Sequence, residues 1–188
     1  MKHIVKLSLA LTLLVMAGIV LSSNAPQGKD KIGEAPGKIS FTGIAGWEAH
    51  GHFENWEFAD LQVPNDDFSE VQATILVSMK SVYVENNDLR KHLLKPDYFG
   101  AKKWPDATIT IEGALETDDR SFSTMAIVNI KGVEQEVALE FTVSEEKPYH
   151  VKGSGELNRR LFNIYGDGPE DGVPIEIDVV LQPELYTN

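Results

Sequence analysis

The sequence predicts an all-β protein built from antiparallel strands. Apolar and polar residues alternate along much of the chain, and an alternation with a period of two places one side of each strand against a core. Turn-forming clusters such as 64–67 and 117–120 separate the alternating segments. The connections are short and no helix recurs between strands, which favours antiparallel neighbours over the crossovers that parallel strands require.

The strand segments follow one another with few interruptions. In the clearest segment, at 71–79, the apolar side carries Val71, Ala73, Ile75, Val77 and Met79. At 107–115, we expect one apolar side with Ile109, Ile111, Gly113 and Leu115. At 122–130, two phases compete, Met125 and Ile127 against Ala126, Val128 and Ile130. Further strands are predicted at 39–41, 47–53, 57–63, 135–143, 149–157 and 175–181, with a bulge near residues 55–56.

About eight or nine amphipathic strands with one polar face each form either a sandwich or a closed barrel, and periodicity alone does not decide between the two. Three glycines, Gly113, Gly153 and Gly155, fall on apolar strand sides. They either leave space in an open interior or mark bends and bulges of the strands.

A single short helix interrupts the strand pattern at residues 86–95. Asn86 is a suitable N-cap, Leu89 and Leu93 lie four residues apart on one helix side, and Pro96 ends the helix. Two helical turns are not stable in isolation. We therefore expect this helix to lie across a sheet face or to close the end of a barrel.

Composition limits the chemistry that the protein can perform. The chain has 188 residues, no cysteine and a formal net charge of −12. The absence of cysteine excludes disulfides, iron–sulfur ligation, thiolate zinc sites and a cysteine nucleophile. The acidic balance disfavours nucleic acid and anionic membrane surfaces as electrostatic partners. A lipid held inside the protein is compatible with it.

The first segment resembles an export signal, with Lys2 and Lys6 followed by about 15 apolar residues. We assign residues 1–25 to a signal peptide or N-terminal anchor, 26–37 to a flexible leader and 38–188 to one β domain. An exported protein of this kind is periplasmic or secreted, or stays attached to the membrane through an uncleaved anchor.

Residues 79–107 carry a family pattern: a strand followed by serine, an Arg-x-His-Leu helix, a Tyr-Phe turn and an aromatic–proline pair. The matching positions are Ser81, Arg90, His92, Leu93, Tyr98, Phe99, Trp104 and Pro105. Segments 51–53, 130–133 and 157–164 match in order. The chain thus resembles the YceI-like family of lipid- and polyisoprenoid-binding proteins. It departs from the family at its short opening strand and at Arg160, where an acidic residue or serine is usual.

The resemblance implies an eight-stranded antiparallel, lipocalin-like barrel with one short helix inserted between strands. Its lumen would hold a long apolar chain, a polyisoprenoid or similar lipid, for transport, storage or sequestration. Eight strands independently suit a barrel whose interior is filled or admits one small ligand. The expected lumen residues are Phe41, Phe53, Ile75, Val77, Met79, Ile109, Ile111, Val128, Ile130, Leu139, Phe141, Ile177 and Val179.

Three cationic or titratable residues are candidates for contacting a lipid head group at the barrel mouth: Arg90, His92 and Arg159. Arg90 and His92 alternatively bind backbone carbonyls and hold the helix to the barrel. Arg159 alternatively belongs to a buried pair or a strand-closing network. Trp56, Tyr98 and Trp104 are expected in core or lid packing.

Metal-dependent catalysis is an alternative that would use Glu48, His50 and His52. The apolar phase of Ala49 and Phe53, however, points these histidines outward. The sequence has no nucleophile elbow, phosphate loop or His-Glu-x-x-His helix. We expect no enzyme, cofactor or metal site. Transient membrane contact is compatible with a lipid carrier, and a ligand-free envelope interaction barrel is the other alternative.

Overall fold

The computed structural model describes residues 36–45 and 48–185, so the predicted signal segment and most of the leader lie outside the described residues. Within these ranges the chain forms eleven strands, one α-helix and five 3₁₀ helices. The strands are β1 (Gly37–Ile44), β2 (Glu48–Phe53), β3 (Trp56–Gln62), β4 (Gln72–Ser78), β5 (Val82–Val84), β6 (Asp106–Glu112), β7 (Leu115–Asp118), β8 (Ser121–Ile130), β9 (Val133–Val143), β10 (Tyr149–Asn158) and β11 (Gly172–Leu181). The helices are α1 (Asn87–Leu93), η1 (Pro64–Asp66), η2 (Phe68–Glu70), η3 (Met79–Ser81), η4 (Arg159–Phe162) and η5 (Pro183–Leu185).

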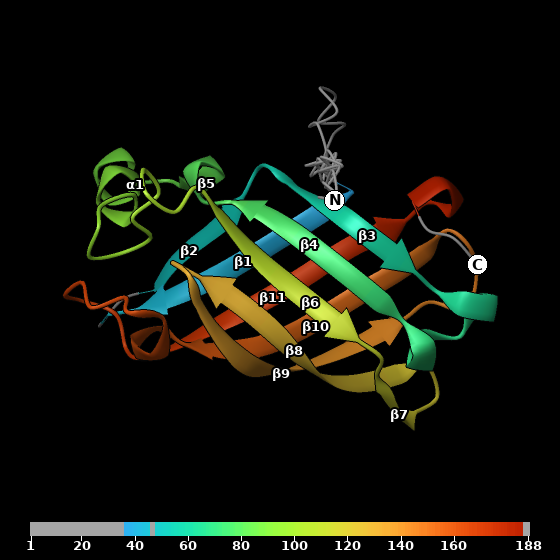
Figure 1. Ribbon diagram of the computed structural model, residues 1–188. Coiled ribbons are helices and arrows are strands. Elements are labelled where there is room, and N and C mark those ends of the chain that lie inside the picture. The colour runs from blue at the N-terminus through green and yellow to red at the C-terminus, as the bar shows by residue number, and fades with distance from the viewer. Residues whose placement is uncertain (1–35, 46–47, 186–188) are drawn as a thin grey trace, which may run out of the picture. The chain divides into compact units, whose positions relative to one another are not determined.

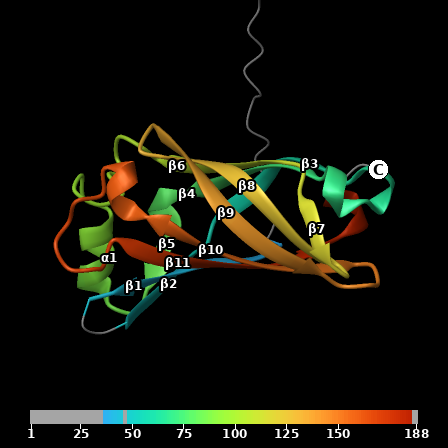
Figure 2. The ribbon, with the colours of Figure 1, turned by 90° about the horizontal axis from the view of Figure 1, so that it is seen from below.

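All strand pairs are antiparallel, and the pairing follows the order β3-β4-β6-β8-β9-β10-β11-β1-β2-β5, with β7 beside β8. The two ends of this order meet because β2 continues into β3 through Glu54 and Asn55, while β4 continues into β5 through η3. At this bend the Glu54 amide donates to the Ser81 carbonyl and the Ser78 amide donates to the Asn55 carbonyl. The sheet therefore curls around a single interior, as Figures 1 and 2 show from two directions.

The prediction of an antiparallel, lipocalin-like barrel with one short helix inserted between strands is confirmed, but the count of eight strands is wrong. Two long strands each bend and divide, giving β2 with β3 and β4 with β5, and β7 adds a short side strand. The predicted bulge is also displaced, because the register irregularity lies in β3 between Phe58 and Asp60. Hydrophobic alternation continues through such bends and does not reveal them.

Burial decides the one strand phase that alternation left uncertain and corrects another. In β8, Ala126 and Val128 face the core, while 56% of Met125 is exposed. The expected face at 107–115 ends at Ile111, because Leu115 is 71% exposed. Gly113 explains this change, since its φ of +87° turns the chain out of β6 before β7 begins.

Helix α1 forms where expected and lies at one end of the curled sheet (Figure 1). The Asn86 side chain accepts hydrogen bonds from the amides of Asp88 and Leu89, which caps the helix. Leu93 is buried in the core and Leu89 packs against it. The helix is therefore fixed at the barrel end by both its cap and its apolar side.

The remaining two glycines on apolar faces have different roles. A Cβ on Gly155 would lie 2.6 Å from Leu139 Cδ2 and 2.8 Å from the Ala138 carbonyl oxygen. On Gly153, by contrast, it would meet its nearest atoms at 3.4 Å, an almost ordinary contact. Gly155 thus permits close packing between β10 and β9, while Gly153 leaves space inside the sheet.

We predict opposite effects for alanine at these two glycines. G155A should lower the free energy of unfolding by about 1–3 kcal/mol, because the strand backbone must shift to admit the methyl group. G153A should be neutral or stabilise the protein by up to about 1 kcal/mol, because the unfolded chain loses freedom. Urea denaturation measures the free energy of unfolding of both variants. Equal destabilisation of the two would contradict the distinction between them.

Candidate functional site

Two cavities lie inside the curled sheet. The larger, of about 140 Å³, is near α1 and is bordered by strand residues together with Leu93, Phe99 and Phe162. The smaller, of about 70 Å³, lies near η2 and is bordered by residues such as Phe68. Leu139 borders both cavities, so one side chain lies where the two spaces approach each other.

The thirteen residues predicted for the lumen all lie on the wall of one cavity or the other. The larger cavity is bordered by Phe41, Phe53, Val77, Met79, Ile109, Val128 and Ile130. The smaller is bordered by Ile75, Ile111, Phe141, Ile177 and Val179, and Leu139 is shared. The inward phase of the strands therefore positions these side chains, and their contact with a ligand remains a prediction.

Residues outside the regular strands complete the larger cavity, and they were not among the residues predicted for the lumen. Tyr98 and Phe99 follow α1, and Ile164 and Pro169 follow η4. In non-strand segments side chains do not alternate with a fixed period, so apolar spacing could not assign them to the lumen. The Tyr-Phe pair of the family pattern was the one available signal.

Three aromatic rings form part of the wall near α1. The ring centroids of Phe41 and Phe53 are 5.6 Å apart, and Phe99 lies 6.1 Å from Phe41 and 5.9 Å from Phe53. Gly51 lies opposite Phe41 in the β1–β2 register, and its lack of a side chain leaves room for that ring. All three rings border the larger cavity.

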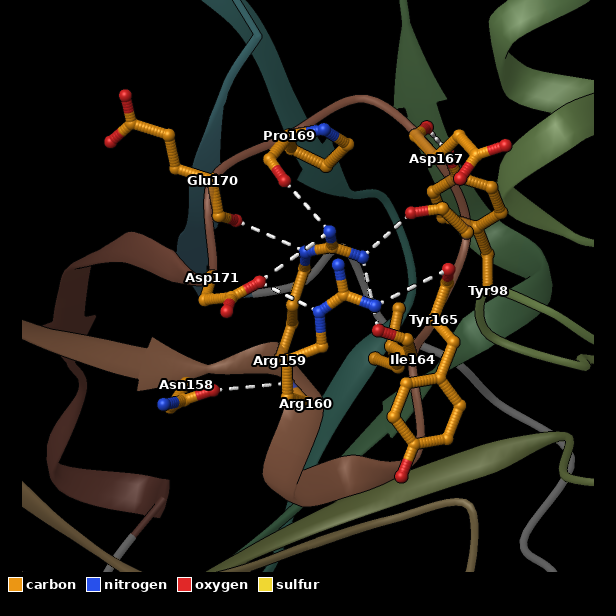
Figure 3. Close-up of polar contacts among 11 residues, drawn as sticks. Tyr98, Asn158, Arg159, Arg160, Ile164, Tyr165, Asp167, Pro169, Glu170 and Asp171 are labelled. Carbon is orange, nitrogen blue, oxygen red and sulfur yellow. Dashed lines mark hydrogen bonds and ion pairs between the residues drawn. The ribbon is translucent and has the colours of Figure 1, made fainter.

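Arg159 is the charged residue on the wall of the larger cavity, and it is 4% exposed. Its Nε donates to the Glu170 carbonyl at 3.0 Å, and its Nη1 donates to the carbonyls of Ile164 at 3.0 Å and Gly166 at 2.8 Å. Its Nη2 donates to the Pro169 carbonyl at 2.7 Å (Figure 3). Arg159 therefore fastens the segment 164–170 over the α1 end of the interior. We call this segment the covering loop.

Further polar contacts hold the covering loop. The Tyr98 hydroxyl donates to the Asp167 carbonyl, and burial raises the pKa of Tyr98, with Arg159 nearby acting in the opposite direction. Arg160 Nε lies 2.7 Å from Asp171 Oδ1 at the end of the loop. Because the Tyr98 hydroxyl and the Arg159 guanidinium both bind backbone carbonyls, polar groups at this end stabilise the loop (Figure 3).

Arg90 and His92 lie on α1 and differ in their contacts. Arg90 Nε donates to the Val82 carbonyl at 2.7 Å, which ties the helix to β5. The His92 side chain is exposed, and its ring packs edge-on against Tyr98 with 5.0 Å between centroids. Arg90 thus makes the backbone contact considered as its alternative to head-group binding. Arg159 instead lies in a buried network with backbone carbonyls.

Glu48, His50 and His52 lie on the outer surface of β2. His50 Nε2 is 3.3 Å from Glu48 Oε2, while the His52 ring lies 4.9 Å from the Tyr83 ring. Across residues 36–45 and 48–185 there is no cluster of three or more histidine, aspartate or glutamate side chains that could hold a metal ion. In the same ranges, no helix has both the length and the apolar character needed to cross a membrane.

Comparisons with known proteins agree with this geometry. The sequence model of the YceI-like domain matches residues 31–181. BcnA of Burkholderia cenocepacia is 18% identical, with a TM-score of 0.70 over 76% of this chain and 94% of that one. The Campylobacter jejuni YCEI protein is 22% identical, with a TM-score of 0.59 over 69% of this chain and 81% of that one.

A third similar structure is a polyisoprenoid binding domain from Saccharophagus degradans implicated in plant cell wall breakdown. It is 10% identical, with a TM-score of 0.60 over 78% of this chain and 93% of that one. No curated protein matches the chain. At these identities the structural similarity establishes a shared fold.

Loss of Arg159 should loosen the covering loop. In R159M four carbonyls lose their donor, and we expect the free energy of unfolding to fall by at least about 2 kcal/mol. The amides of Tyr165, Gly166 and Glu170 should exchange hydrogen faster, because opening of the loop exposes them.

The matched control is R160M. It removes the neighbouring arginine, which is more exposed and pairs with Asp171. It should cost about 1 kcal/mol or less. Hydrogen-exchange mass spectrometry measures the exchange of the loop amides in both variants, and denaturation measures their free energies of unfolding. Unchanged exchange in residues 164–170 of R159M would show that Arg159 does not fasten the loop.

Proposed function

Because the chain belongs to the YceI-like family, we propose that its barrel binds a single long apolar chain, a polyisoprenoid or similar lipid. The observation that carries this proposal is the pair of cavities within one interior, both bordered by Leu139. The Saccharophagus degradans domain, described as polyisoprenoid binding, supports the choice of ligand class. Transport, storage or sequestration of the lipid would each use this arrangement.

Cavity size implies that the interior widens when the ligand enters. The larger cavity, of about 140 Å³, is close in volume to engineered apolar cavities of about 150 Å³ that bind benzene. A long chain needs both cavities and must displace side chains between them. Leu139 borders both spaces, and Met79 is a flexible side chain on the wall of the larger one. Rotation of such side chains would join the cavities into one channel.

The energetics favour exchange with a membrane over extraction from water. Each methylene group transferred out of water contributes about 0.8 kcal/mol. A bilayer is as apolar as the barrel interior, so transfer from membrane to lumen is close to neutral for each carbon atom. Ligand choice would then depend on the length and width of the lumen.

The polar end of the ligand would remain outside the lumen. Arg159 lies on the wall of the larger cavity, but its guanidinium donates to four carbonyls of the covering loop. The Tyr98 hydroxyl donates to another carbonyl of that loop. Neither group offers a free donor to a phosphate or hydroxyl inside, so a head group would stay at the barrel mouth.

Family membership favours binding over catalysis as the role of this chain. If residues 1–25 direct export, the protein would act in the periplasm or outside the cell, either free or anchored. A lipid carrier in that compartment would move apolar chains across an aqueous space.

Filling the larger cavity tests the proposed ligand site. Val128 is buried on its wall, whereas the adjacent Ile127 is 37% exposed on the opposite side of β8. V128W should lower uptake of a fluorescent polyprenol from vesicles by at least about tenfold, because the indole occupies the ligand space. I127W is the matched control and should bind as the unaltered protein does.

Circular dichroism and thermal unfolding report whether V128W folds. If it does not, V179W provides a second obstruction, in the smaller cavity. Uptake by folded V128W and V179W equal to that of I127W would contradict the lumen site. Absence of any uptake by the unaltered protein would contradict the proposed function itself.

A further inference from the structure

The described part of the barrel exposes six large apolar side chains, and two pairs of them differ in their charged neighbours. Met125 and Ile127 lie on the outer face of β8, where Glu136 faces Ile127 across the sheet. Leu161 and Tyr165 lie beside the covering loop and are 54% and 57% exposed. The first group has acidic neighbours and the second has cationic ones, so the two suit different partners.

Three segments meet around Leu161 and Tyr165. Lys131 Nζ donates to the Pro96 carbonyl at 2.8 Å and to the Asn163 carbonyl at 2.6 Å. The Tyr165 amide donates to the Asp97 carbonyl at 3.0 Å. Residues 95–104, 130–132 and 160–166 therefore form one continuous surface, which we call the mouth surface.

The mouth surface is positively charged, whereas the molecule as a whole is acidic. It carries five cationic side chains, Lys95, Lys102, Lys103, Lys131 and Arg160, in a chain whose formal net charge is −12. Asp97 is its single carboxylate, although Asp171 pairs with Arg160 and Asp167 follows the surface directly. Lys102 and Lys103 are exposed, and Lys103 Nζ lies 4.6 Å from the Trp104 ring centroid.

The same segments cover the larger cavity on their inner side. Tyr98 and Phe99 of residues 95–104 border the cavity, as do Phe162 and Ile164 of residues 160–166. Figure 1 places α1 and the loop after η4 at this one end of the barrel. Apolar side chains thus face the cavity, while the exposed side chains are Lys95, Lys102, Lys103, Leu161 and Tyr165.

We propose that the mouth surface docks onto an anionic lipid bilayer. Cations near such a surface are attracted to its lipid head groups, and tyrosine suits the interface between water and hydrocarbon. Leu161 would enter the apolar layer next to the covering loop. This inference rests on the proposed lipid-binding function, and it names the entry route: a chain would pass from bilayer to lumen without crossing water.

Cysteine substitution gives a local test, because the full chain has no cysteine of its own. L161C carrying a polarity-sensitive fluorophore is mixed with vesicles of phosphatidylglycerol and phosphatidylcholine. We expect emission to shift to shorter wavelength, and the shift to weaken in about 0.5 M salt, where charges are screened. M125C, labelled in the same way, should show no shift, and vesicles of phosphatidylcholine alone should shift neither label.

Charge variants in the labelled L161C background test whether the lysines of the mouth surface bind the vesicles, rather than lysines anywhere on the protein. K102Q/K103Q should weaken binding to the anionic vesicles by about 25-fold, since each cation near the surface contributes about fivefold. K38Q/K152Q removes two exposed lysines from the outer faces of β1 and β10 and should leave binding unchanged. Equal weakening by the two double variants would overturn the proposal.

Two further results would also overturn it: no shift at residue 161, or equal shifts at 161 and 125. Because these vesicles contain no polyprenol, the outcome does not depend on the lumen. Polyprenol uptake without docking would leave the carrier function in place and reject this surface. Docking without uptake would reject the carrier function alone.

Discussion

Closure of the sheet upon itself is the constraint on which the rest of the structure depends. β2 pairs with β1 and β5, and its continuation β3 pairs with β4, so the ladder of backbone hydrogen bonds returns to its start. This closure fixes the girth of the interior, although the short β7 pairs on one side only, with β8. Every inward side chain must then either fill that interior or border a space in it. The two apolar cavities are the space that remains.

The α1 end of the barrel is held together by different contacts from its wall. At the α1 end, irregular segments cover the interior, and their carbonyls need donors that no strand partner supplies. Arg159 provides these donors to the covering loop, and Tyr98 adds one more. A buried arginine bound to carbonyls keeps the loop closed while its own charge stays hydrogen-bonded. The cover is thus held by these polar bonds together with the buried side chain of Ile164.

The sequence predicted the wall of the barrel well and its ends poorly. Inward positions such as Val77 and Ile109 lie on a cavity wall because a strand side chain alternates with a fixed period. The bends that divide β2 from β3 and β4 from β5 depend on long-range pairing and leave the alternation intact. Phe162 and Ile164 were not assigned to the lumen, since only the folded chain brings their segment against the cavity. Net charge is a sum over the whole chain, so it does not show that lysines distant in sequence meet at the mouth surface.

If a long apolar chain binds as we propose, the two cavities become one channel around it. An experimental structure of the protein purified with its bound lipid tests this most directly. We expect one elongated apolar density that runs from Phe99 past a rotated Leu139 toward Phe68. Side chains packed without a gap around Leu139, with the lipid bound elsewhere, would contradict it.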